Sequence, residues 1–206
     1  MRKGIGISCI LLGLLCLMIA VGFAFYNRKE ANDGEKTSQA LLQSVQENIR
    51  ETELPSASQP EQTQPEAVSK PVKQQMPTVP AGNYESIGIL AIPVLKLELP
   101  VLTDWNYEKL KKAPCHYFGS YYEPDFVIAA HNYNSHFGRL TQLQPGDLVT
   151  FTDVAGQVYC YEVVLLETLP ATATEEMISS GFDLSLYTCT PGGGNRVTVR
   201  CRSIKP

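Results

Sequence analysis

The sequence predicts a closed all-β barrel with a few short helices, behind an N-terminal membrane-spanning helix. Three observations favour this fold. An uncharged apolar run fills residues 4–26, a polar stretch follows to residue 83, and from residue 84 short β-type segments alternate with glycine- and proline-containing turns. Many short strands with few helices are typical of barrels, in which closure leaves no free sheet edge. The 206 residues suffice for one ordinary domain plus these two N-terminal segments.

Residues 1–29 are the predicted signal-anchor. Basic residues flank the apolar run on both sides, with Arg2 and Lys3 before it and Arg28 and Lys29 after it. A run of about 23 residues is enough for a helix to cross a hydrocarbon core of about 30 Å. A cleaved signal peptide is the alternative, but its apolar region would be shorter and a clear A-x-A site would follow. We expect a single-pass helix in the cell membrane, with the rest of the chain extracellular.

Residues 30–83 are the predicted disordered polar stalk. Gln, Glu, Ser, Pro and Thr dominate, and no aromatic residue occurs between Tyr26 and Tyr84. A segment of this composition buries too little apolar surface to offset the entropy lost on ordering. Residues 35–52 are also compatible with a frayed helix, because apolar residues recur there near helical spacing. These residues are Leu41, Leu42, Val45 and Ile49.

Residues 84–206 are the predicted folded domain. Its first part, residues 87–102, is rich in strand-forming residues, and two prolines place those strands at edges or bends. Residues 104–112 are predicted to be helical, with Asp104 as the N-cap. Residues 115–124 are predicted to be a loop, whose aromatic side chains either wall a groove or cover the barrel floor.

The second half of this domain contains most of the predicted strands. Phe126–Ala130 is a short apolar run typical of a buried strand. Residues 147–169 resemble a hairpin that turns at Ala155-Gly156. A helical turn is expected near Thr174, and the last two strands are expected on either side of a Pro-Gly-Gly-Gly loop at residues 191–194.

Residue types suited to thiol chemistry stand at the ends of these strands. Cys189 ends one strand and Arg196 begins the next. If the two strands pair, a permanent cation lies close to the thiol, where it can stabilise a thiolate or a developing oxyanion. His131 ends the Phe126–Ala130 strand and is the candidate base. Arg200 and Arg202 share a strand face with Arg196 and compete for its role, but Arg196 is nearest the loop.

Several short segments of the chain occur in a characteristic order: Gly88-Ile89-Leu90-Ala91-Ile92-Pro93, His131-Asn132, Phe137-Gly138-Arg139-Leu140, Leu143, Gly146-Asp147-Leu148-Val149, Thr188-Cys189-Thr190 and Arg196. Taken together and in this order, they resemble the sortases, which are cysteine transpeptidases of the Gram-positive cell surface. The resemblance covers about residues 84–206 and implies the eight-stranded sortase barrel. It also implies Cys189 as nucleophile, His131 as general acid and base, and Arg196 as the residue that stabilises oxyanion and substrate. Thr188 and Asn132 are the expected substrate-binding neighbours.

The resemblance implies a membrane-anchored cysteine transpeptidase. Cys189 attacks a sorting-signal peptide bond, and an amine of the cell wall or its precursor resolves the thioacyl intermediate. The expected partners are surface proteins that carry a sorting signal, that amine and the membrane. The net charge of −4 gives no indication of a nucleic-acid partner. The alternatives are a peptidase that hydrolyses the same intermediate and a non-catalytic surface-binding module in which Cys189 forms a disulfide.

Pilin-polymerising class C sortases often carry a lid with an Asp-Pro-aromatic motif before the barrel. We find no such motif here, and Asp104-Trp105 lacks the proline. The sequence therefore predicts a class A, B or D-like sortase, with the class otherwise unassigned.

No cofactor or metal site is expected. His131, His136 and Cys189 do not have the spacing of a compact zinc motif. Four acidic loop residues are candidates for calcium binding, although solvated loop charges are the favoured interpretation: Glu123, Asp125, Glu175 and Glu176. At most one disulfide is expected, among Cys115, Cys160 and Cys201, with Cys189 free.

Overall fold

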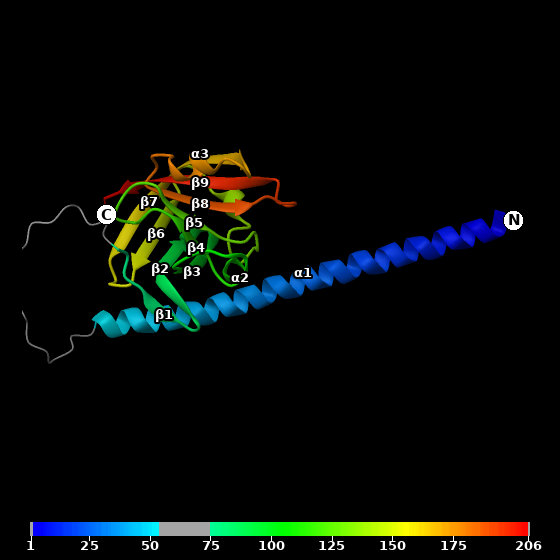
Figure 1. Cartoon of the computed structure of the whole chain (residues 1–206), viewed down its shortest axis with the longest axis horizontal. Coiled ribbons are helices and arrows are strands. Elements are labelled where there is room, and N and C mark those ends of the chain that lie inside the picture. The colour runs from blue at the N-terminus through cyan, green and yellow to red at the C-terminus, as the bar shows by residue number, and fades with distance from the viewer. Residues whose placement is uncertain (1, 54–74, 206) are drawn as a thin grey trace, which may run out of the picture.

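The computed structural model describes residues 2–53 and 75–205 of the chain, and its first element is the long helix α1 (Arg2–Glu53). Its apolar N-terminal part projects away from a β-barrel, and its C-terminal part runs along the barrel wall (Figure 1). By length and composition α1 is able to cross a membrane, and its apolar side chains there are exposed, including Leu11, Met18 and Phe25.

Eight strands close into the barrel. Their order is β2-β3-β4-β5-β8-β9-β7-β6, and β6 pairs back with β2, while β1 adds to the edge of β2. The pairs β3–β4 and β5–β8 are parallel and the others are antiparallel. The strands are β1 (Val79–Ala81), β2 (Tyr84–Ile92), β3 (Leu97–Leu102), β4 (Cys115–Phe118), β5 (Phe126–Ala129), β6 (Leu148–Asp153), β7 (Val158–Pro170), β8 (Leu184–Cys189) and β9 (Asn195–Ile204). The predicted closed eight-stranded barrel is confirmed.

The barrel interior is filled by alternate side chains of its strands, as the period of two along a strand requires. Leu90, Phe126, Phe151 and Leu184 belong to this core and are fully buried. Closure of β2 onto β6 depends on Gly88, which has a φ of 149°. A Cβ atom at this position would lie 2.1 Å from the Thr152 carbonyl oxygen, so only glycine allows this approach.

Helix α1 packs on the outer face of the barrel. Its Leu41, Leu42, Val45 and Ile49 are buried in a second apolar cluster. Their partners lie on β1 to β4 and just before β4: Ala81, Ile89, Leu102, Ala113 and Cys115. The expected disordered stalk is therefore wrong for residues 30–53, and the folded unit includes residues before Tyr84. Residues 54–74, also assigned to the stalk, lie outside the described residues.

The short helices are α2 (Tyr107–Leu110), α3 (Thr174–Ile178) and the 3-10 turns η1 (Pro93–Leu95) and η2 (Leu140–Gln142). Asn106, rather than the predicted Asp104, caps α2, because its side chain accepts a hydrogen bond from the Lys109 amide. Asp104 instead pairs with the Lys109 ammonium at 2.6 Å. The predicted loop over residues 115–124 is wrong at its start, where β4 pairs with β5.

His136 links the stability of the fold to pH. It is fully buried, and neither ring nitrogen has a hydrogen-bond partner among the described residues. Burial, and after it the nearby His131, lowers the pKa of His136 to about 4. The unfolded chain therefore takes up this proton at a higher pH than the folded protein does. The resulting contribution to stability is complete above the unfolded pKa and decreases as pH falls toward 4.

We expect acidification from pH 7 to pH 5 to lower the free energy of unfolding by about 2 kcal/mol through His136. Urea unfolding of the full chain in detergent at both values measures this. His136→Phe keeps a planar ring without a titrating nitrogen, so this variant should lose correspondingly less stability over the same interval. Equal losses in the two proteins would show that His136 is not the group responsible.

Candidate active site

Three strand ends converge at one end of the barrel. Strand β8 lies between β5, which runs parallel to it, and β9, which runs antiparallel. Cys189 and Arg196 are directly opposed in the β8–β9 register. Ala129 is paired with Tyr187, so the same register continued by two residues brings His131 beside Cys189. Because side chains alternate along strands, His131, Cys189 and Arg196 belong to the same outward-facing set. The tip of the β8–β9 hairpin lies at the barrel end that faces the N-terminal half of α1 (Figure 1).

Thr188 links strand β8 to the segment that follows β5. Its hydroxyl donates a hydrogen bond of 2.8 Å to the carbonyl of Ala130, the residue before His131. The Ala130 amide donates to the Tyr187 carbonyl at 3.1 Å. Thr188 is only 3% exposed, so the structure gives its side chain a buried contact between strands. A substrate contact through this residue stays a prediction.

The His131 ring is half-buried and stacks on the ring of Tyr133, with centroids 4.1 Å apart and planes 18° from parallel. Burial lowers the pKa of His131, whereas the Asn132 side chain and the Glu30 carboxylate act in the opposite direction. The balance favours neutral imidazole at neutral pH, which is the form that accepts a proton. The structure thus gives Asn132 an effect on His131, and its predicted contact with substrate stays a prediction.

The structure separates the three arginines of β9. The Arg196 guanidinium reaches the loop before it and donates to the carbonyls of Gly193 at 2.9 Å and Asn195 at 3.1 Å. Arg200 is buried and its guanidinium is occupied by contacts within the fold. Arg202 lies over the ring of Phe182, 4.6 Å from its centroid. Of the three, Arg196 is the one placed opposite Cys189.

Arg200 holds three elements together. Its guanidinium donates to the Glu167 carboxylate at 2.7 Å, to the Ser185 hydroxyl at 2.8 Å and to the Glu176 carbonyl at 2.6 Å. These partners belong to β7, β8 and α3. A buried guanidinium with this many acceptors is a structural group, because its donors are already used within the protein.

The other cysteines of the domain do not lie opposite Arg196 in the β8–β9 register, as Cys189 does. Cys115 and Cys201 are buried, and burial raises the pKa of each thiol to about 12. Cys160 lies on β7 and is partly exposed. All three, like Cys189, are free thiols in the structure, so the structure contains no disulfide among these four.

Asp125, one of the four acidic loop residues, makes protein contacts. One oxygen of the Asp125 carboxylate accepts hydrogen bonds from the Ser180 amide, the Ser180 hydroxyl and the Gly181 amide. Asp125 therefore fixes the connection between α3 and β8. Within residues 2–53 and 75–205, no three His, Cys, Asp or Glu side chains are grouped as metal ligands would be.

The aromatic residues of the 115–124 segment divide between the two predicted locations. Tyr121 is buried against Phe126 and Phe151 inside the barrel. Tyr117 contacts Trp105 and Tyr187, with ring centroids 5.5 Å and 5.2 Å away. Tyr187 stands two residues before Cys189, so Tyr117 belongs to the surface beside the candidate nucleophile.

Sequence reasoning missed two residues near His131. Tyr133 follows it by two positions, and the aromatic side chain there was the available signal. Glu30 gave no signal, because its influence on His131 depends on how α1 packs against the barrel. Both residues bear on the properties of the imidazole.

The sortase-domain family model matches residues 90–204. The chain belongs to the sortase family. No curated protein matches it. Among solved structures, the sortase C1 of Streptococcus suis is 27% identical, with a TM-score of 0.51, over 59% of this chain and 74% of that one. The sortase C-1 of Streptococcus pneumoniae is 27% identical, with a TM-score of 0.51, over 59% of this chain and 68% of that one. A Clostridium perfringens sortase D5 transpeptidase is 20% identical, with a TM-score of 0.52, over 58% of this chain and 79% of that one. At this identity the similarity supports the fold alone.

These comparisons correct the predicted class. The structures similar to this sortase are mostly class C enzymes, including a sortase C1 of Streptococcus agalactiae and a sortase C2 of a Group B Streptococcus pilus island. The prediction of a class A, B or D-like sortase is therefore wrong, and the findings point to class C. That prediction relied on a missing lid motif, but a lid lies outside the barrel, whereas the structural similarity is carried by the barrel itself.

Proposed function

We propose that this sortase is a membrane-anchored transpeptidase in which Cys189 is the nucleophile, His131 the general acid and base, and Arg196 the oxyanion partner. The observation that carries the proposal is the strand register. In this register Cys189 lies opposite Arg196 on β9. The parallel neighbour β5 ends at Ala129, two residues before His131. Nucleophile, base and cation then surround one point at the barrel end, as acyl transfer requires.

The proposed reaction has two halves. His131 first accepts the proton of the Cys189 thiol. The resulting thiolate attacks a backbone carbonyl of the sorting peptide, and the negative oxygen that forms is stabilised by Arg196. The peptide C–N bond then breaks, and His131 gives its proton to the leaving amine. An acceptor amine next attacks the thioester and transfers a proton to His131. A new amide bond forms and the Cys189 thiolate leaves, so each step uses only protein and substrate groups.

We further propose that the apolar part of α1 holds the enzyme in the cell membrane with the barrel outside. The donor is a surface protein carrying a sorting signal, and the acceptor is an amine of the cell wall or its precursor. Similarity to class C structures, one of them described as a sortase of a pilus island, adds an amine on a second surface protein as an acceptor to test.

The test uses the full chain in detergent with a library of quenched peptides that span sorting-signal motifs. Intact mass detects thioacyl adducts, and peptide mapping locates them. We expect an adduct on Cys189 that resolves faster when oligoglycine or a lysine-containing peptide is added. Resolution at the same rate without amine would indicate a hydrolase, and the absence of any adduct would contradict both activities.

A further inference from the structure

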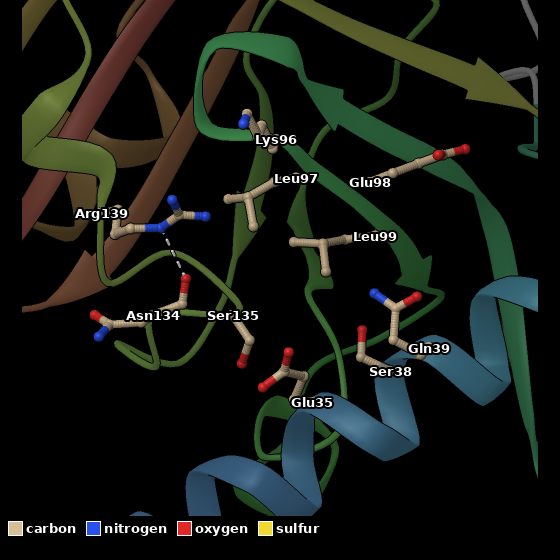
Figure 2. A pocket seen from close by; sticks show the side chains of 10 residues that line it. All are labelled: Glu35, Ser38, Gln39, Lys96, Leu97, Glu98, Leu99, Asn134, Ser135 and Arg139. Carbon is tan, nitrogen blue, oxygen red and sulfur yellow. Dashed lines mark hydrogen bonds between the residues drawn. The ribbon is translucent and has the colours of Figure 1, made fainter.

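The loop that carries His131 lies against α1. Figure 2 shows Glu35 and Ser38 of α1 on one side of a cavity, with Asn134 and Ser135 of the loop across from them. Arg139 fixes the far end of this loop, because its guanidinium donates to the Asn134 carbonyl at 3.0 Å and to the Leu95 carbonyl at 2.6 Å. The loop thus has a fixed end at Arg139, and α1 flanks the part nearer His131.

Just before this cavity, at Gly34, helix α1 packs tightly against the rest of the domain. A Cβ atom on Gly34 would lie 2.7 Å from the Lys111 carbonyl oxygen and 3.1 Å from the nearest carbon of the Tyr133 ring. Glu30, four residues before, pairs with the Lys111 ammonium at 3.3 Å. The segment from Glu30 to Gly34 is therefore packed between the end of α2 and the Tyr133 ring.

Tyr133 transmits this contact to the catalytic imidazole. The Tyr133 ring stacks on the His131 ring, and the two ring centroids are 4.1 Å apart. The Tyr133 ring also packs against Gly34, so closely that a Cβ atom there would lie 3.1 Å from the nearest ring carbon. A ring held in this way removes orientations that the imidazole would otherwise sample.

We propose that Tyr133 is a positioning residue for His131 and that the Glu30–Gly34 turn of α1 completes the active site by holding the Tyr133 ring in place. The proposal rests on the catalytic role proposed for His131. Proton transfer depends on the direction of the imidazole nitrogens, and a displacement of about 1 Å can lower a rate by up to about 100-fold. The N-terminal helix then has a role in catalysis beyond that of an anchor.

Electrostatics connect the same residues. The Glu30 carboxylate opposes the lowering of the His131 pKa. Burial, and after it Glu30, raises the pKa of Tyr133 to about 12. The titratable and charged groups around the imidazole are Glu30 on α1, Lys111 after α2, Tyr133 and His136 on its own loop, and Cys189 and Arg196 on β8 and β9.

The first experiment measures kcat and KM for the full chain in detergent. Gly34→Ala forces the helix away from the Lys111 carbonyl, so we expect kcat to fall about 10-fold with KM nearly unchanged. Gly22→Ala is the matched control, since the same substitution on the same helix meets nothing within 4 Å. Tyr133→Leu should also lower kcat about 10-fold, and Tyr133→Phe, which keeps the ring, should restore it.

These variants make the proposal refutable. A normal kcat in either Gly34→Ala or Tyr133→Leu would overturn it, and so would a Tyr133→Phe enzyme as slow as Tyr133→Leu. Thermal unfolding of each variant identifies any that fail to fold. The Tyr133 pair keeps the test decisive even if Gly34→Ala destabilises the packing of α1.

A second measurement does not depend on turnover. Titration of the His131 ring, followed by ¹⁵N NMR, should give a lower His131 pKa in Glu30→Gln than in wild type. The substitution removes the carboxylate that favours the protonated imidazole. Glu35→Gln should leave the His131 pKa unchanged. An unchanged His131 pKa in Glu30→Gln would contradict the proximity of α1. If the wild type forms no adduct at Cys189, the proposed function fails, while this titration still decides whether α1 acts on His131.

Discussion

Replacement of Cys189 by alanine is expected to abolish transpeptidation, with a loss on the order of 10⁴-fold or more in kcat. Alanine removes the only atom that bonds to the acyl group, and no other thiol lies in the β8–β9 register opposite a guanidinium. Stability should change little, because Cys189 is partly exposed at a strand end. Single-turnover mass spectrometry and amine-dependent product formation measure the loss.

Cys160→Ala is the matched control for this variant. Cys160 is also a partly exposed cysteine on a strand, but it lies on β7, where it pairs with Ile204. We expect full activity from Cys160→Ala. Adducts that persist in Cys189→Ala and disappear in Cys160→Ala would place the nucleophile on β7 and contradict the proposed site.

Arg196→Ala is expected to lower kcat about 10²- to 10³-fold while the free energy of unfolding stays nearly unchanged. The guanidinium that would face the oxyanion is lost, but its present bonds are only to two carbonyls of an exposed loop. Arg196→Lys keeps the charge without the planar fork, so its kcat should lie between those of wild type and Arg196→Ala. Steady-state kinetics and urea unfolding on the same preparations separate the two effects.

Arg200→Ala should show the opposite pattern. It leaves the Glu167 carboxylate and three further acceptors without their donor, so we expect the free energy of unfolding to fall by about 3 kcal/mol. Under conditions where the variant is folded, its kcat should be close to that of wild type. A catalytic loss in Arg200→Ala larger than that in Arg196→Ala would exchange the roles assigned to the two arginines.

Local patterns were sufficient to predict the barrel and the placement of the three candidate site residues. Strand β5 is a continuous apolar run, and β8 and β9 are separated by an unmistakable glycine-rich turn. His131, Cys189 and Arg196 stand at strand ends, so pairing of those strands was enough to bring them together. The structure was needed to separate the roles of Arg196 and Arg200, because both residues occupy the same face of β9 and only their contacts distinguish them.

The role of α1 was not readable in the same way. Composition averaged over residues 30–83 indicated disorder, although Leu41, Val45 and Ile49 already formed an apolar stripe. Whether such a stripe is buried depends on a partner surface far along the chain, here on β1 to β4. The contact between Gly34 and Tyr133 joins residues about 100 positions apart, which no local pattern encodes.

The continuity of α1 fixes how far the reactive thiol stands from the bilayer, if the apolar run spans it as proposed. At a rise of about 1.5 Å per residue, Gly34 comes about 12 Å along the axis after Tyr26. A flexible tether would let the barrel sample a volume above the lipid, whereas an unbroken helix confines Cys189 to a thin layer. Encounters with substrates anchored in the same bilayer then become a two-dimensional search, in which a cleavage site is reached only when it lies at the matching height.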